Sequence, residues 1–113
     1  MKLKTSVHGA VTVFHLDGNL MGGPDATALN GKLHELMEEG KKQVVVDLAH
    51  VEFMNSSGLG LLIGGASLMK TAGGGLKLAA VSEKILALIK IARLGPVFEP
   101  FATVPEAVAS FKK

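Results

Sequence analysis

The sequence predicts an α/β fold: a small mixed β-sheet of four to five strands with about four helices packed mainly on one side. The chain has 113 residues, the length of one ordinary domain, so residues 1–113 are expected to form a single domain. Apolar residues make up 48% of the chain, which is enough for a core and argues against disorder. Strand-like and helix-like segments also alternate along most of the chain, as in sheets whose parallel strands are joined by crossover helices.

The first expected elements are two strands and a helix. Residues 11–17 (VTVFHLD) alternate between apolar and polar side chains, which predicts a strand, and residues 2–7 are expected to pair with it. A helix is predicted over residues 22–40. Pro24 suits its first turn, and Gly40 ends it.

The middle of the chain predicts a strand, a helix and another strand. Residues 43–49 (QVVVDLA) form a short β-branched run with few polar residues, typical of a strand covered on both faces or central in a sheet. A helix-like segment extends over residues 57–72 and ends at a run of three glycines. Residues 76–81 (LKLAAV) are the next predicted strand.

The last third predicts two more helices. Ser82 can cap a helix over residues 83–94, because a serine hydroxyl accepts a hydrogen bond from a free amide in the first turn. A short strand is expected near residues 97–98. Thr103 and Glu106 then have the spacing of a capping box before a final helix.

Composition excludes several classes of function. The formal net charge is +2 and the lysines are scattered, which does not fit nucleic-acid binding. The longest nearly uncharged run, residues 53–69, falls short of the roughly 20 apolar residues that a membrane span needs, so no direct membrane insertion is expected. The lack of cysteine fits a reducing cytoplasm. Histidine and acidic residues do not cluster at metal-ligand spacing, so neither a metal nor a cofactor is expected.

The most informative stretch is VEFMNSSGLGLLIGG, residues 51–65. Asn55, Ser56 and Ser57 stand between a predicted buried strand and the start of a helix, and any of them could be the helix cap. Capping is the ordinary role of such residues. The free amides and the dipole at a helix start also favour an anion, so a phosphate on Ser56 would be tolerated there and would add charge and bulk.

The helix behind these residues is apolar on two sides. One stripe is Leu59, Leu62, Ile63, Ala66 and Met69, and the opposite stripe is Leu61, Gly64, Gly65 and Leu68. No charge occurs before Lys70, whereas a surface helix normally has one charged face. Either both faces are buried or one is an exposed apolar patch; a small domain has little to cover the second face, which favours a docking surface formed by the second stripe. Gly60, Gly64 and Gly65 would then allow close approach of a partner, with tight packing on the sheet as the alternative.

These residues resemble a known family. The segments DLAHVEFMNSSGLGLLI and GGGLKLAAVSEKILALIKIARL look like the STAS domain of bacterial anti-sigma factor antagonists, and a G-x-L motif at residues 18–20 adds to the likeness. The resemblance implies a STAS-like fold and phosphorylation of Ser56 by an anti-sigma factor that is also a serine kinase of the GHKL type. It implies that the unphosphorylated antagonist binds the anti-sigma factor and frees the sigma factor, and that a PP2C-type phosphatase reverses the modification.

The sequence departs from the family pattern near Ser56. Asn55 stands where the family commonly has an acidic residue, and Met21 stands where an acid often follows G-x-L. Gly65 and Leu68 replace positions that are often charged or polar. The residues expected to contact a partner are Asn55, Ser57, Gly58, Leu59, Gly60, Leu61, Gly64, Gly65, Leu68 and Met21.

Two other functions remain open. A STAS module that is never phosphorylated could act as a scaffold or as a subunit of a transport complex through constitutive protein–protein interaction. A small serine hydrolase is not favoured, because neither Ser56 nor Ser57 lies in a G-x-S-x-G turn and no motif ties a histidine to Ser56. A binding protein rather than an enzyme is therefore expected.

Overall fold

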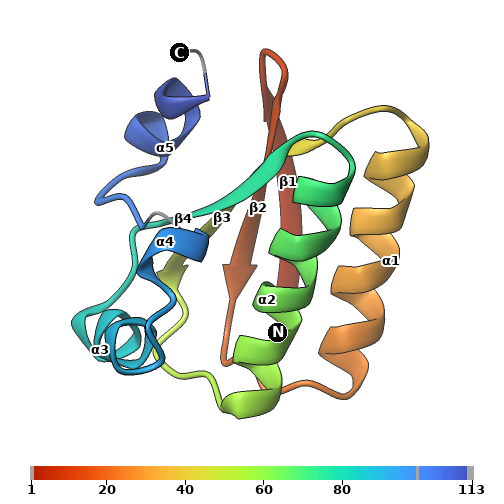
Figure 1. Ribbon diagram of the computed structural model, residues 1–113. Coiled ribbons are helices and arrows are strands. Elements are labelled where there is room, and N and C mark those ends of the chain that lie inside the picture. Colours follow the sequence, from red (N-terminus) through yellow and green to blue (C-terminus); the bar gives the residue numbers. More distant parts are fainter. Residues whose placement is uncertain (1, 99, 112–113) are drawn as a thin grey trace.

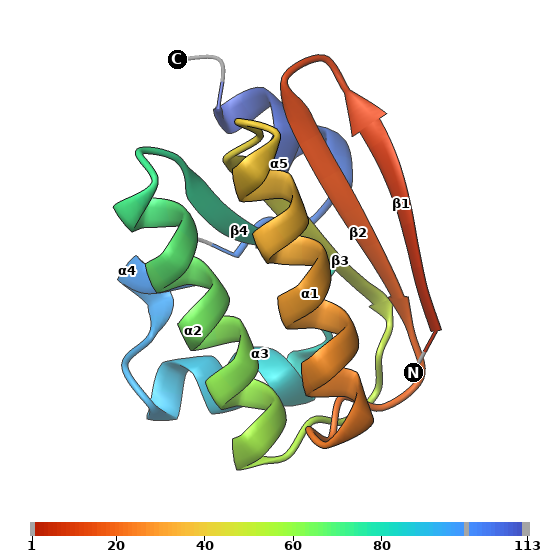
Figure 2. The same cartoon turned by 90° about the vertical axis from the view of Figure 1, so that its right-hand side faces the viewer.

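The computed structural model describes residues 2–98 and 100–111, which form a four-stranded mixed sheet and five helices (Figures 1 and 2). The strands are β1 (Lys2–His8), β2 (Val11–Asp17), β3 (Gln43–His50) and β4 (Gly75–Ala79). The helices are α1 (Pro24–Glu38), α2 (Ser56–Thr71), α3 (Glu83–Ile91), α4 (Gly95–Phe98) and α5 (Val104–Ser110). The strand order is β1-β2-β3-β4, with β1 antiparallel to β2 and the other two pairs parallel. The predicted fold class is confirmed.

The helices cover the two faces of the sheet unequally. α1 and α2 lie side by side on one face, α3 and α4 extend the same layer, and α5 lies on the opposite face (Figures 1 and 2). None of the helices in the described part of the chain is both long and apolar enough to cross a membrane. The packing mainly on one side follows from the strands, whose bulkier apolar residues point toward α1 and α2.

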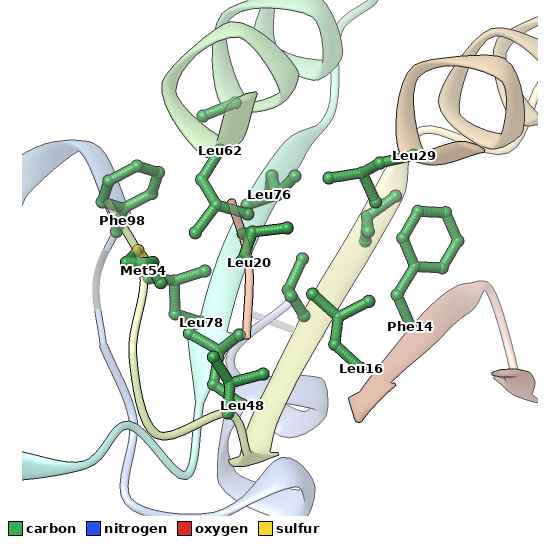
Figure 3. Packing of buried hydrophobic residues seen from close by; sticks show 14 of the residues in the cluster. Phe14, Leu16, Leu20, Leu29, Leu48, Met54, Leu62, Leu76, Leu78 and Phe98 are labelled. Carbon is green, nitrogen blue, oxygen red and sulfur yellow. The ribbon is translucent and has the colours of Figure 1, made fainter. Parts of the chain in front are cut away.

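The main core fills the space between the sheet and the larger helical layer (Figure 3). Its fully buried large side chains include Phe14, Leu16, Leu20, Leu29, Leu48, Met54, Leu62, Leu78 and Phe98. In α1, Leu29, Leu33 and Leu36 face this core, as the helical spacing predicts, whereas Met37 is only partly buried. Burial of an aliphatic side chain stabilises a fold by roughly 1.5–3 kcal/mol, so this layer dominates the stability of the domain.

A second, smaller core lies under α5. Val11, Val13, Val45 and Ala79 meet Ala107 and Val108 there. β3 is therefore covered on both faces, with Val44 and Val46 in the main core and Val45 in the second one. This confirms the prediction made from the β-branched run of residues 43–49.

Several predicted elements differ from the structure; for example, α1 ends at Glu38 and not at residue 40, and α3 ends at Ile91 and not at residue 94. The first helix begins at Pro24 and not at residue 22, because Gly22 and Gly23 have positive φ angles of 83° and 63°, which a helix cannot contain. β4 stops at Ala79 because Ala80 has a φ of 55°. The short strand expected at residues 97–98 is wrong: this segment belongs to α4, and Phe98 is buried in the main core.

Candidate partner-binding site

Ser56 is the first residue of α2 and is exposed to solvent. Its position is fixed by two loops that run together after β2 and β3. Leu20 forms a parallel bridge with Met54, and its amide donates to the carbonyl of Phe53 at 3.1 Å. Both Leu20 and Met54 are buried, so the loops are anchored from inside and present the start of α2 outward.

Asn55 is the residue that caps α2. Its backbone is extended, and its side-chain Oδ1 accepts a hydrogen bond from the Gly58 amide at 2.8 Å. Its Nδ2 donates to the carbonyl of Met21 at 3.3 Å. Because Asn55 supplies the cap, the hydroxyls of Ser56 and Ser57 are not needed for it, and no hydrogen bond engages either hydroxyl within residues 2–98 and 100–111.

Two glycines bring the Met21 loop and α2 into close contact. A Cβ placed on Gly58 would lie 2.1 Å from the carbonyl oxygen of Leu20, so only glycine fits there. A Cβ on Gly22 would lie 2.9 Å from the Ser57 Cβ, and Gly22 also has a positive φ of 83°. Gly58 is thus a packing residue of the domain itself, and its expected contact with a partner can only be indirect.

The two stripes of α2 are not divided as the sequence suggests. The buried residues are Gly58, Leu62, Gly65, Ala66 and Met69, and the exposed ones include Gly60, Ile63, Gly64 and Ser67. The placement of Gly65 on an exposed patch is wrong: a Cβ there would lie 2.9 Å from Leu33 Cδ1 and 3.2 Å from Leu76 Cδ1. Ile63, which the sequence places on the same stripe as the buried Leu62, is 38% exposed.

The physical reason is that neither stripe contains a polar or charged residue. Periodicity alone then cannot choose which stripe faces the sheet, and the absence of a side chain at Gly65 lets α2 approach α1 and β4 closely. Leu59, Leu61 and Leu68 lie between these extremes; each is partly buried and packs against the main core. Gly60 and Gly64 have no neighbouring atom within 4 Å of an added Cβ, so open space lies over them.

Two large apolar side chains are exposed in the loops that hold Ser56. Met21 is 45% exposed and Phe53 is 42% exposed. Phe53 was not among the residues expected at the site, although an aromatic residue three positions before Ser56 was a signal for it. Solvent-exposed aromatic and methionine side chains are enriched at protein interfaces, so this part of the surface has the composition of a docking site.

A carboxylate lies near Met21, although the residue at position 21 is itself neutral. The Met21 amide approaches Asp25 Oδ2 at 3.5 Å, from the first turn of α1. Asp25 therefore brings a negative charge to the loop that the G-x-L motif opens, although it follows the motif by five residues.

Among the described residues, no hydrogen bond joins Ser56 to a histidine side chain. His15 lies in β2, where its Nδ1 is 2.7 Å from Asp47 Oδ2 and its Nε2 is 2.8 Å from Ser6 Oγ. Among the described residues, no three histidine, aspartate or glutamate side chains could hold a metal ion.

Comparisons with known proteins place this arrangement in a family. The STAS domain family model matches residues 2–107. The anti-sigma-B factor antagonist of Bacillus subtilis (strain 168) is 35% identical over 74 residues, 66% of this chain and 67% of that protein. An anti-sigma factor antagonist from Mycobacterium paratuberculosis has a similar structure, with a TM-score of 0.84 and 21% identity over 99% of this chain and 94% of that one. SpoIIAA, a Bacillus cell fate determinant solved in its phosphorylated form, has a TM-score of 0.76 and 22% identity, covering 96% of this chain and 98% of that one. The family model spans most of the sequence, and the chain belongs to the STAS domain family.

Proposed function

We propose that the protein is an anti-sigma factor antagonist, a binding protein rather than an enzyme, that binds an anti-sigma factor and so frees the sigma factor. The observation that carries this proposal is the exposed Ser56 at the first position of α2, beside the exposed apolar Met21 and Phe53. The relative from Bacillus subtilis, which bears the name of this function, supports it. We place the protein in the cytoplasm, because the kinase expected to phosphorylate it needs ATP.

We further propose that phosphorylation of Ser56 switches the binding off. A phosphate would stand beside amides at the start of α2 that have no intrahelical acceptor, so the fold would tolerate it. It would add about −1.5 to −2 charges between Met21 and the exposed side of α2, where a partner has to desolvate apolar surface. Charge at that place weakens binding without unfolding the domain.

The proposed contact surface follows the exposed side of α2. Ser57 and the partly buried Leu59, Leu61 and Leu68 border it. Gly60 and Gly64 occupy helical positions with open space above them, and each costs roughly 1 kcal/mol of helix stability relative to alanine. Among the described residues, no contact explains glycine at these two positions, whereas a partner backbone that approaches α2 closely does.

The switch is tested with the cognate GHKL-type serine kinase, ATP and intact-mass measurement. The wild-type protein is expected to gain one phosphate, and Ser56→Ala is expected to gain none. Ser57→Ala and Ser67→Ala are matched controls, because both serines are exposed on the same helix, and each should still gain one phosphate. A PP2C-type phosphatase should restore the original mass. Labelling that persists in Ser56→Ala would contradict the proposal.

A second candidate function is a STAS scaffold, or a transport-complex subunit, that uses the same surface permanently. The neutral Asn55 and Met21, at positions where the family often has acids, favour it. Ser56→Asp distinguishes the two functions when binding to the purified anti-sigma factor is measured. The switch predicts loss of binding with Ser56→Asp and normal binding with Ile91→Asp, which places a charge on an exposed residue of α3. A scaffold predicts that Ser56→Asp has only the limited effect of a bulky charge at the edge of the surface.

A further inference from the structure

β4 is an edge strand, and part of its outer edge has no backbone partner. The Gly75 amide donates inward to Lys42, at 2.9 Å. Toward the outside, the Leu78 carbonyl accepts from the Phe101 amide at 2.9 Å. Because successive residues of a strand point their amide and carbonyl groups to opposite edges, Leu76 faces outward like Leu78. Within the described part of the chain, no backbone hydrogen bond reaches Leu76 from that side.

A groove of about 550 Å³ lies along this free edge. Its lining residues are Ile63, Ala66, Ser67 and Lys70 of α2, residues 74–77 at β4, and Pro96 and Val97 of α4. The three elements lie next to one another in both views (Figures 1 and 2). Ile63 is 38% exposed and Val97 is 46% exposed, so the groove has apolar walls open to solvent beside unpaired backbone groups.

We propose that this groove binds an extended peptide segment of a partner protein, which pairs with the edge of β4 at Leu76. An added strand satisfies the free amide and carbonyl and places alternate side chains in the groove, which is how strand addition combines affinity with selectivity. Apolar side chains of the peptide lie between Ile63 and Val97, and an acidic side chain meets Lys70.

The charges of the groove select the occupant. Its lining includes Lys70 and Lys77 and no aspartate or glutamate. The Lys77 ammonium donates to Ser110 Oγ at 2.8 Å and lies 4.4 Å from the centre of the Phe111 ring, on the α5 side of the sheet. Lys70, in the last turn of α2, is therefore the cation available to an acidic peptide. A second copy of this chain would bring a like-charged groove against the first, so an acidic segment of another protein fits better.

This site is separate from the Ser56 switch. Ile63, the lining residue of α2 nearest to Ser56 in sequence, follows it by seven residues, or roughly 10 Å along the helix axis at 1.5 Å per residue. Peptide binding in the groove should therefore be insensitive to the charge at Ser56. The Ser56→Asp protein separates the two proposals, since it abolishes binding of the anti-sigma factor under the proposed function and leaves the groove unchanged.

The test uses nuclear magnetic resonance titration with a synthetic hexapeptide of alternating valine and threonine that ends in aspartate. The expected result is saturable movement of the backbone amide signals of Leu76, Ile63 and Val97. Lys70→Glu should weaken binding at least tenfold, whereas Ile91→Asp, a charge introduced at an 80% exposed residue outside the groove, should leave it unchanged. Ser56→Asp should also bind normally.

Two altered peptides test the mode of binding without changing the protein. N-methylation of alternate peptide amides removes their donors and should abolish binding if strand pairing holds the peptide. Replacement of the terminal aspartate by asparagine should weaken binding to the wild-type protein but not to Lys70→Glu. The proposal is overturned if millimolar peptide leaves the Leu76 signal in place, if the N-methylated peptide binds equally well, or if the same signals move with protein concentration alone, which would identify a second copy as the occupant.

Discussion

Asn55 donates a hydrogen bond from its side-chain Nδ2 to the carbonyl oxygen of Met21 across 3.3 Å. These are the two positions near Ser56 at which the sequence has neutral residues in place of the acids common in the family, and the structure joins them directly. An aspartate at position 55 could cap α2 equally well but could not donate to a carbonyl. The amide therefore ties the loop before α1 to the start of α2 in a way that a carboxylate cannot.

Substitution of Asn55 should separate its two roles. Asn55→Ala removes the cap on the Gly58 amide and should lower the free energy of unfolding by about 1 kcal/mol. Asn55→Asp keeps the cap and places a negative charge at the positive end of α2, so its free energy of unfolding should stay within about 0.5 kcal/mol of wild type. Urea denaturation measures both values. An equal loss in the two variants would mean that the bond to Met21, rather than the cap, is the important one.

The glycines of α2 should respond to alanine in opposite directions. Gly58→Ala places a methyl group 2.1 Å from the Leu20 carbonyl oxygen and should destabilise the domain by at least about 2 kcal/mol. Gly60→Ala meets no atom within 4 Å and should stabilise it by up to about 1 kcal/mol, because alanine favours the helix. Thermal unfolding followed by circular dichroism tests this contrast. Gly60→Ala should also bind the anti-sigma factor more weakly, despite its greater stability, if the partner approaches the helix there.

Leu62 and Ile63 are neighbours on α2 with different surroundings. Leu62 is fully buried in the main core, so Leu62→Ala should cost about 2–5 kcal/mol of unfolding free energy. Ile63 is 38% exposed, and Ile63→Ala should cost about 1 kcal/mol. Chemical denaturation of the two variants decides the orientation of α2. Similar losses would mean that Ile63 is buried as Leu62 is, so that the whole stripe of Leu59, Leu62, Ile63, Ala66 and Met69 faces the sheet.

The hydrogen bonds of His15 specify its tautomer. An ionised Asp47 can only accept, so His15 Nδ1 should carry the proton and Nε2 should accept from the Ser6 hydroxyl. Nitrogen chemical shifts of the imidazole at neutral pH report this directly. In Asp47→Asn, an amide group can donate toward Nδ1, and the tautomer with the proton on Nε2 should become populated. An Nε2-protonated ring in the wild-type protein would contradict the assignment.

Much of the fold could be predicted from the sequence because local signals agreed with the tertiary structure. The β-branched run at residues 43–49 and the caps at Ser82 and Thr103 each specify one structure, and both cap residues accept from the amide three positions on. The strand expected near residues 97–98 failed because the burial of Phe98 in the core outweighed its strand propensity. Such a contact is made with residues far away in the chain, and local patterns do not contain it.

The site was predictable in its place but not in its orientation. The position of Ser56 at the start of an apolar helix followed from the order of residues. The sequence could not show that Gly65 faces Leu33 and Leu76, because two apolar stripes on one helix are equivalent until the helix is packed. Nor could it show the free edge of β4, since strand order is set by the pairing of segments distant in sequence.

The two-sided cover of β3 has a consequence for how the molecule opens. Its central valines are enclosed by α1 and α2 on one face and by α5 on the other, and it is hydrogen-bonded to β2 and β4. Amide protons of residues 44–46 should therefore exchange with deuterated solvent only when the whole domain unfolds, whereas those of the outward-facing residues of β1 exchange through local fraying. The slowest-exchanging amides would report the global stability, and binding at the surface of α2 would slow them only as far as it stabilises the entire fold.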